Sequence, residues 1–363
     1  MKRHLPMLLC VALVASCNGH GASTNGFVPS ASENASAFRN TLGSSCHLHR
    51  HVFGYGTSAI SGSSLVTGYG GAIYLPYITL NPPQTLVARV DATGTVRQYN
   101  LSNRIMPGAI FAAYGDDGGL WFDDTARLSI GRLAIDGSIK EYHLPASAGT
   151  DIFFWAAATG RDGRPWFALT NYSRSSQEIV RVHRDGTMDV FPKPPSNDST
   201  LAMAWGFDEN MWLSDGSGVS EMSQQGVLRH VAPVDPDTLT NGPDHAMWGT
   251  FPGTVYRIAA NGNVRSYSIG SFFDASGITD GGDAHLWMLL YQYIDPTQPI
   301  LGYSAVALGK MSQTGFLYTI PFVTNPQNIL AVGPVTTDRA GNVWFTYTDT
   351  SGINVVEYTV NTC

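Results

Sequence analysis

The chain has 363 residues, a formal net charge of −7, 43% apolar residues and only 13% charged residues. It is long enough for one large domain or two ordinary ones, and its acidic balance argues against binding nucleic acid or anionic lipid through charge. Glycine, proline and aromatic residues are abundant, while long Ala/Glu/Lys/Leu stretches are missing. This composition favours many short strands joined by tight turns.

The N-terminal residues 1–17 predict a secretory leader. Lys2 and Arg3 form a basic region, and residues 5–15 form an apolar stretch too short to span a bilayer. The VASC segment that ends at Cys17 resembles the lipobox of bacterial lipoproteins, in which the cysteine becomes the lipidated first residue. We therefore expect an exported protein of the bacterial cell envelope, lipid-anchored at Cys17. The alternative is an ordinary secretory signal and a secreted or periplasmic protein.

Residues 18–45 are small and polar, which is typical of a flexible tether. A single domain is expected to follow over residues 46–363. Its only cysteines are Cys46 and Cys363, and two cysteines in an oxidising compartment suggest one disulfide.

A repeat in seven copies determines the expected architecture. An aromatic residue follows an apolar or proline residue at Tyr74, Trp121, Trp166, Trp212, Trp248, Trp287 and Trp344. Six copies have a glycine six residues earlier, and six copies continue into a second hairpin whose glycine can take the positive φ of a tight turn. Each copy thus predicts one four-stranded antiparallel sheet. Seven such repeats predict an all-β, seven-bladed propeller with the tryptophans packed between blades.

The seventh copy runs through residues 353–360 and lacks an outer strand of its own. Residues 46–53 alternate like an outer strand and belong to no other copy, so we expect them to complete the last blade and close the ring. A Cys46–Cys363 disulfide would hold that closure, at nominally ~5 kcal/mol in the loop-entropy description. His47, His49 and His51 share one face of this segment. They form either a metal site or the polar outer face of an edge strand.

One face of a propeller carries short, regular turns, while the other carries the variable loops after each aromatic strand and the crossovers between blades. Binding residues usually lie on such variable loops over a rigid scaffold. Asp123 and Asp124 directly follow the aromatic strand of the second copy, and Asp215 follows that of the fourth. We expect Asp123 and Asp124 to have a cap or turn role, or, as the alternative, one of the pair to lie at the channel mouth.

The sixth copy has the longest loop after its tryptophan. Tyr291, Tyr293 and Tyr303 lie in this loop, where they form either an aromatic lid over a ligand or a packing contact on the rim. No histidine of the domain is placed for general-base work at the variable face.

The cassette G-x-D-G-x-L-W-F, followed by I-G-R-[IL]-x-x-D-G-x-[IV]-x-E-[YF]-x-L-P, resembles the repeat of the virginiamycin B lyase family over roughly residues 58–360. The resemblance implies a seven-bladed, Mg-dependent lyase that linearises cyclic depsipeptides by elimination across the ester. It also implies working histidines in a P-H-[GA]-I crossover motif, with a glutamate two residues before one of them. The matching positions of this chain carry no histidine; they are Ser63, Ile110, Trp155, Leu201, Asp237, Ser276 and Gly333.

Aspartates stand near two of these positions. Asp235 and Asp237 occupy the frame in which the family shows E-P-H, and Asp274 precedes Ser276 by two residues. An aspartate could serve as the base of an elimination only if burial or neighbours raised its pKa. Three carboxylates together suit a hard cation such as Mg²⁺ or Ca²⁺, so we predict a metal or polar-ligand site at Asp235, Asp237 and Asp274. The alternative is solvated loop residues, and Ser276 is a further candidate at the channel mouth.

The sequence therefore predicts an exported, monomeric propeller that binds a small-molecule or peptide ligand on its loop face. It predicts no nucleic-acid partner, membrane contact only through the lipid anchor, no certain cofactor, and no assignable catalytic residue. The alternative is a Mg-dependent carbon–oxygen lyase that linearises a cyclic depsipeptide or a related ester. A calcium-dependent lactonase-type propeller is a third class, but its Glu, Asn and Asp pattern has no match in this sequence.

Overall fold

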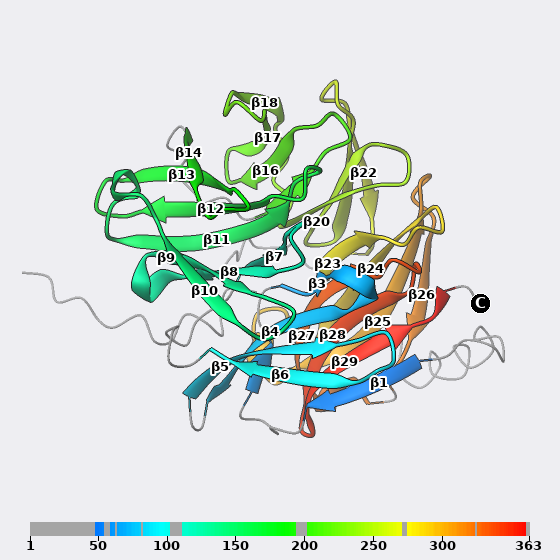
Figure 1. Cartoon of the computed structure of the whole chain (residues 1–363). Helices are drawn as coiled ribbons and strands as arrows, with labels where there is room; N and C mark the ends of the chain where they lie inside the picture. Colours follow the sequence, from blue (N-terminus) through cyan, green and yellow to red (C-terminus); the bar gives the residue numbers. More distant parts are fainter. Residues whose placement is uncertain are drawn as a thin grey trace, which may run out of the picture.

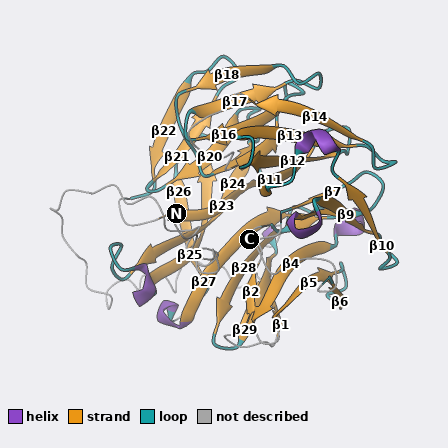
Figure 2. Cartoon of the chain, turned by 90° about the vertical axis from the view of Figure 1, so that its left-hand side faces the viewer, coloured by secondary structure: helices purple, strands orange, loops and turns teal. Residues whose placement is uncertain are grey.

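The computed structural model describes residues 48–53, 59–61, 64–80, 83–101, 111–193, 202–270, 274–323 and 325–360. These residues form seven antiparallel sheets, one for each copy of the repeat. Figure 1 shows the sheets following one another around the molecule in chain order, and Figure 2 shows the same arrangement from the side. The predicted all-β, seven-bladed propeller is thus confirmed.

Every blade runs from an inner strand at the channel to an outer strand at the periphery. Blade 1 contains an inner strand in two pieces, β2 (Ala59–Ser61) and β3 (Val66–Thr67), then β4 (Ile73–Leu80), β5 (Pro83–Val90) and β6 (Val96–Asn100). Blade 2 contains β7 (Ala112–Tyr114), β8 (Leu120–Asp124), β9 (Ser129–Leu133) and β10 (Ile139–His143). Blade 3 contains β11 (Ile152–Thr159), β12 (Pro165–Asn171), β13 (Ser176–Val182) and β14 (Met188–Lys193). Blade 4 contains β15 (Ala202–Trp205), β16 (Met211–Asp215), β17 (Gly218–Met222) and β18 (Leu228–Ala232).

The remaining blades follow the same order. Blade 5 contains β19 (Thr238–Asn241), β20 (Met247–Phe251), β21 (Thr254–Ile258) and β22 (Val264–Ser268). Blade 6 contains β23 (Asp274–Asp280), β24 (His285–Tyr293), β25 (Tyr303–Ser312) and β26 (Leu317–Pro321). Blade 7 contains β27 (Ile329–Thr337), β28 (Val343–Asp349), β29 (Gly352–Tyr358) and, as its outer strand, β1 (Leu48–Phe53).

The outer strand of blade 7 comes from the other end of the described chain. β1 pairs antiparallel with β29, from Leu48 opposite Tyr358 to Phe53 opposite Ile353. In Figure 1 the blue β1 lies beside the red β29. Blade 7 therefore has four strands although its own copy of the repeat supplies three.

Short 3-10 helices join some of the strands: η3 (Tyr69–Gly71), η4 (Thr125–Arg127), η5 (Ala146–Ala148), η6 (Pro299–Leu301) and η7 (Pro326–Asn328). No helix in the described part of the chain is long and apolar enough to cross a membrane.

The seven inner strands surround a central channel. They are β3, β7, β11, β15, β19, β23 and β27, and each contacts the inner strands of both neighbouring blades. The edge of every sheet therefore faces the channel axis. The ends of the inner strands form the two rims of the channel.

The repeated aromatic residues fill the spaces between blades. Trp121 packs with Phe154 and Phe167 of blade 3, and Trp248 packs with Met288 and Leu290 of blade 6. The other five aromatic residues of the repeat join core clusters with the following blade in the same way. A buried tryptophan removes about 200 Å² of mostly apolar surface from water, worth roughly 5 kcal/mol. The predicted packing role of the tryptophans is confirmed.

Steric constraints explain why the repeat has glycine at both of its regularly spaced positions, as blade 5 shows. Gly262, in the second hairpin of blade 5, has φ +84°, as that tight turn requires. Gly242, six residues before Trp248, has ordinary φ, but a Cβ atom there would lie 2.2 Å from the indole Cδ1. The tryptophan therefore packs directly on the backbone of the strand end that precedes it.

Candidate functional site

The two ends of the channel differ in what borders them. We call the end where the inner strands begin the crossover face, because the connections between blades and the loops after the aromatic strands meet there. We call the end where the inner strands finish the turn face, because short turns lead from there into the aromatic strands. The sequence placed its candidate residues on the crossover face.

Three carboxylates meet on the crossover face between blades 5 and 6. Asp235 and Asp237 lie just before β19, and Asp274 is the first residue of β23. A carboxylate oxygen of Asp274 accepts a hydrogen bond of 3.2 Å from the Gly253 N–H. The Asp235 carboxylate accepts one of 3.3 Å from the Ser214 hydroxyl. The fold thus brings together the acidic trio that the sequence singled out.

Asp237 is the most perturbed member of the trio. Its pKa is raised to about 6, first by loss of surrounding water and then by the negative charges of Asp235 and Asp274. Its side chain is nevertheless exposed at the surface, so solvent and a ligand can reach it. Burial also raises the pKa of Asp274. Neither Asp237 nor Asp274 has a cationic side chain as a partner among the described residues.

The trio does not form a metal cage. Among the described residues, no group of three or more His, Cys, Asp or Glu side chains is arranged to hold a metal ion. Mg²⁺ demands near-ideal octahedral geometry, and Ca²⁺ takes six to eight oxygen ligands. A Mg²⁺ or Ca²⁺ ion at Asp235, Asp237 and Asp274 therefore stays a prediction.

Asp123 and Asp124 point into the protein. Asp123 is only 3% exposed; its carboxylate accepts hydrogen bonds of 2.6 Å from the Phe111 N–H and 3.4 Å from the Thr125 hydroxyl. Burial raises its pKa to about 7. Asp124 is fully buried and caps η4 by accepting a hydrogen bond of 3.2 Å from the Arg127 N–H. The second residue thus takes the cap role that the sequence predicted.

Asp215 forms an ion pair inside the protein. Its carboxylate contacts the Lys193 ammonium group, and both side chains are buried. Lys193 also donates a hydrogen bond of 2.7 Å to the Gln177 side chain. The contact joins β16 of blade 4 to blade 3, so the carboxylate charge is already compensated inside the protein.

Ser276 is also used internally, because its hydroxyl donates a hydrogen bond of 2.6 Å to the Gly333 carbonyl of blade 7. The loop tyrosines form a cluster, with ring centroids 5.3 Å apart for Tyr291 and Tyr293 and 5.2 Å apart for Tyr293 and Tyr303. Tyr291 and Tyr303 are buried in the core between blades 6 and 7, and Tyr293 packs against it. The cluster therefore supports the rim of blade 6. The antiparallel register also places Tyr291 opposite Asp274.

The structure describes only some of the remaining residues for which the sequence predicted a role. His49 and His51 lie on β1. Four others lie outside the described part of the chain: Cys17, Cys46, His47 and Cys363.

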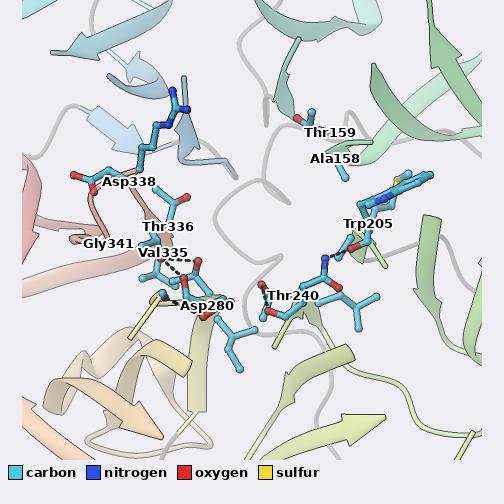
Figure 3. A pocket seen from close by; sticks show the side chains of 18 of the residues that line it. Ala158, Thr159, Trp205, Thr240, Asp280, Val335, Thr336, Asp338 and Gly341 are labelled. Atoms are coloured by element: carbon cyan, nitrogen blue, oxygen red, sulfur yellow. Dashed lines mark hydrogen bonds between the residues drawn. The ribbon is translucent and has the colours of Figure 1, made fainter. Parts of the chain in front are cut away.

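The turn face contains a cavity that sequence reasoning missed. It has a volume of about 640 Å³ and is lined by the ends of the inner strands of blades 3 to 7. Figure 3 shows Thr159, Trp205, Thr240, Asp280 and Thr336 around this opening. One signal could have indicated it: the residue two before the repeat glycine or Asp338 is always small. These residues are Val66, Ala113, Ala158, Ala204, Thr240, Thr279 and Thr336.

Comparisons with known proteins agree with this geometry. The sequence model of the virginiamycin B lyase family matches residues 51–220. None of the curated proteins searched matches the chain.

Solved structures share the whole propeller. A streptogramin B lyase is 17% identical, with a TM-score of 0.65, over 86% of this chain and 98% of that chain. A catalytically inactive virginiamycin B lyase from Staphylococcus aureus, with quinupristin, is 18% identical, with a TM-score of 0.64, over 86% of this chain and 99% of that chain. A putative gluconolactonase is 10% identical, with a TM-score of 0.50, over 89% of this chain and 95% of that chain.

At these identities the likeness to solved structures shows the fold. The partial family match and the repeat cassette point in the same direction. The resemblance predicted from the cassette is thereby confirmed: the chain is a seven-bladed β-propeller that resembles the virginiamycin B lyase family over residues 51–220.

Proposed function

We propose that the protein is an exported propeller that binds a ligand with a positively charged group on its crossover face. The observation that supports this most is the acidic trio of Asp235, Asp237 and Asp274. Repulsion within the trio helps raise the pKa of Asp237, and a cation placed between the carboxylates would relieve that repulsion. The absence of histidine at the family's motif positions fits a binding protein without the family's histidine chemistry.

A second candidate function is carbon–oxygen lysis of a cyclic depsipeptide. It is favoured by one observation: Asp237 stands at a motif position of the family's histidine, and its pKa is about 6. A carboxylate with that pKa is ionised at neutral pH and basic enough to remove a proton in an elimination. The Asp237 carboxylate would take a proton from the carbon next to the one that bears the ester oxygen. The electrons of that C–H bond would form a C=C bond, and the ester C–O bond would break to release a carboxylate.

One titration separates the two functions. We expect quinupristin to bind the full chain without ring opening, as followed by calorimetry and by mass spectrometry of the ligand. Binding should strengthen as the pH rises through about 6, because Asp237 loses its proton there. Asp237→Asn should weaken binding about tenfold, the equivalent of ~1.4 kcal/mol.

The matched control is Asp151→Asn, since Asp151 is an exposed acid just before the inner strand of blade 3. Ring opening that disappears in Asp237→Asn would establish the lyase instead. Absence of both binding and ring opening would reject this class of ligand.

We also propose that Cys17 carries the lipid anchor. The support is the leader and lipobox pattern of residues 1–17. In a bacterial host, the full chain should fractionate with membranes, and Cys17→Ser should move it to the soluble fraction. Mass spectrometry of the N-terminal peptide should show the lipid on Cys17. An unmodified Cys17 in membrane-free protein would contradict the proposal.

A further inference from the structure

The turn-face cavity is a second possible ligand site, separate from the acidic trio. β23 runs from Asp274 in the trio to Asp280 at the cavity. Its seven residues span about 20 Å at ~3.3 Å per residue. Ligands of the two sites would therefore not share contacts. The cavity volume of about 640 Å³ lies within the ordinary range for small-molecule sites.

Most polar groups around the cavity already have partners. The Thr159 hydroxyl donates a hydrogen bond of 2.8 Å to the Tyr114 carbonyl of blade 2. Asn241 donates to the Trp205 carbonyl of blade 4, and Thr337 donates to the Asp280 carbonyl of blade 6 over 2.6 Å. These contacts make the wall rigid and leave few groups available to a ligand.

Two opposite charges remain available. One carboxylate oxygen of Asp280 accepts a hydrogen bond of 3.0 Å from the Gly282 N–H. The other oxygen has no hydrogen-bond or ion-pair partner among the described residues. Arg339 of blade 7 also lines the cavity, is exposed, and makes no ion pair with another described residue. Asp280 and Arg339 thus offer a negative and a positive side chain that are not paired with each other.

A third group completes the polar set. The Thr240 hydroxyl of blade 5 lines the cavity, and its only hydrogen bond within the described part of the chain is a long one of 3.4 Å to the neighbouring Asn241 carbonyl. Burial is the largest cause that raises the pKa of Asp280, followed among the raising causes by the nearby Asp283 and Asp244 carboxylates. A ligand cation at this position would restore favourable charge balance.

We propose that the turn-face end of the channel binds a small zwitterion, such as a free amino acid or a short peptide. Its ammonium group contacts Asp280 and its carboxylate contacts Arg339. The guanidinium fork suits a carboxylate because it can donate two parallel hydrogen bonds. The Thr240 hydroxyl is available to a polar group between the two charged ends. This site does not depend on the proposed function of the crossover face.

The test uses the full chain and the tripeptide Ala-Ala-Ala in calorimetric titrations. We expect the free tripeptide to bind, and its N-acetylated and C-amidated forms each to bind about tenfold more weakly. Asp280→Asn should weaken binding of the free and amidated peptides but leave the acetylated peptide unaffected. Arg339→Gln should weaken binding of the free and acetylated peptides but leave the amidated peptide unaffected.

Two controls locate the site. Arg161→Gln alters an exposed turn-face arginine that pairs with Glu209 and does not line the cavity, so it should leave binding unchanged. Asp151→Asn should also leave tripeptide binding unchanged, because Asp151 is an exposed acid of the crossover face outside both sites. Thermal unfolding of each variant checks folding, and the two blocked peptides test the charges without any substitution. Absence of tripeptide binding, insensitivity to both blocking groups, or loss through Asp237→Asn but not Asp280→Asn would overturn the proposal.

Discussion

In blades 2, 5 and 6, the aspartate in the turn before the aromatic strand joins three parts of its blade. In blade 5 the Asp244 carboxylate accepts a hydrogen bond of 2.8 Å from the Trp248 indole N–H and one of 2.5 Å from Arg257 Nε. Blade 2 repeats this arrangement with Asp117, Trp121 and Arg132. Blade 6 repeats it with Asp283, Trp287 and Lys310. The turn, the indole and the third strand are thereby held together. In these blades the charged residue at the start of the second-hairpin motif therefore has a structural role, because it pairs with the turn aspartate. It is Arg132, Arg257 or Lys310.

Replacing Asp244 by Ala should destabilise the protein by about 1–3 kcal/mol. The buried Trp248 indole N–H would lose its acceptor, and Arg257 would lose its ion pair. Chemical denaturation measures the loss. Asp162→Ala is the matched control in blade 3, because the Trp166 indole N–H has no hydrogen-bond partner among the described residues. An equal loss in both variants would contradict the role assigned to Asp244.

The same carboxylates show where residue-level prediction ends. Local turn chemistry explains Asp116 and Asp117 only as turn residues, since D-D-G is a common turn sequence. The structure gives Asp117 hydrogen bonds to Trp121 and Arg132. Turn propensity is local, whereas these partners lie on two other strands of the sheet.

At the scale of the strand, one position of the inner strand connects neighbouring blades. In six of the seven blades, the residue directly before the repeat glycine, or before Asp338 in blade 7, contacts the preceding blade. Where it is Thr or Asn, its side chain donates to the carbonyl of the same position in that blade. The four cases are Thr67 to Thr337, Thr159 to Tyr114, Asn241 to Trp205, and Thr337 to Asp280.

Where this position holds Trp or Tyr, its ring packs against an aromatic ring of the preceding blade instead of donating a hydrogen bond to that blade. Trp205 lies against Trp166 of blade 3 with ring centroids 6.3 Å apart, and Tyr114 lies against Tyr74 of blade 1 at 5.9 Å. Because the position alternates between polar and aromatic residues, the sequence pattern alone did not reveal it. The shared role becomes visible only when neighbouring blades are side by side.

Thr337→Val should weaken the contact between blades 6 and 7. The Thr337 hydroxyl donates to the Asp280 carbonyl over 2.6 Å and lies 2.9 Å from the Thr279 hydroxyl. We expect a loss of about 1–2 kcal/mol, measured by urea denaturation. Thr240→Val removes only a 3.4 Å contact within its own strand, so its effect should stay within about 0.5 kcal/mol. Equal stability of Thr337→Val and the parent protein would show that the inter-blade bond contributes nothing.

At the scale of the whole molecule, blade 7 depends on strands that are far apart in the sequence. β1 and β29 pair from Leu48 opposite Tyr358 to Phe53 opposite Ile353. The Cys46–Cys363 disulfide stays a prediction, because both cysteines lie outside the described residues. A bond there would tie β1 to β29 across nearly the full length of the domain.

Cys46→Ser should destabilise the oxidised protein by about 2–5 kcal/mol. Reduction of the parent protein should cause a similar loss, whereas reduction of the variant should change nothing further. Thermal unfolding with and without dithiothreitol, together with thiol titration, checks both statements. Two free thiols at positions 46 and 363 in the purified, oxidised protein would contradict the disulfide.

The sequence by itself determined the architecture of this protein. Each copy of the repeat carries its own aromatic residue and nearly every copy its own turn glycines, and the steric rules that explain them act within one blade. The acidic trio was also visible, because Asp235, Asp237 and Asp274 stand at fixed offsets from the repeated tryptophans.

Only the tertiary structure decided which of the remaining candidates are available to a ligand. Asp123 and Asp124 turn inward, and Asp215 pairs with Lys193 of the neighbouring blade. The pKa of Asp237 and the free charges at the turn-face cavity likewise depend on side chains from adjacent blades. Burial and electrostatic interaction depend on distances between residues of different blades, and no spacing along a single repeat contains those distances.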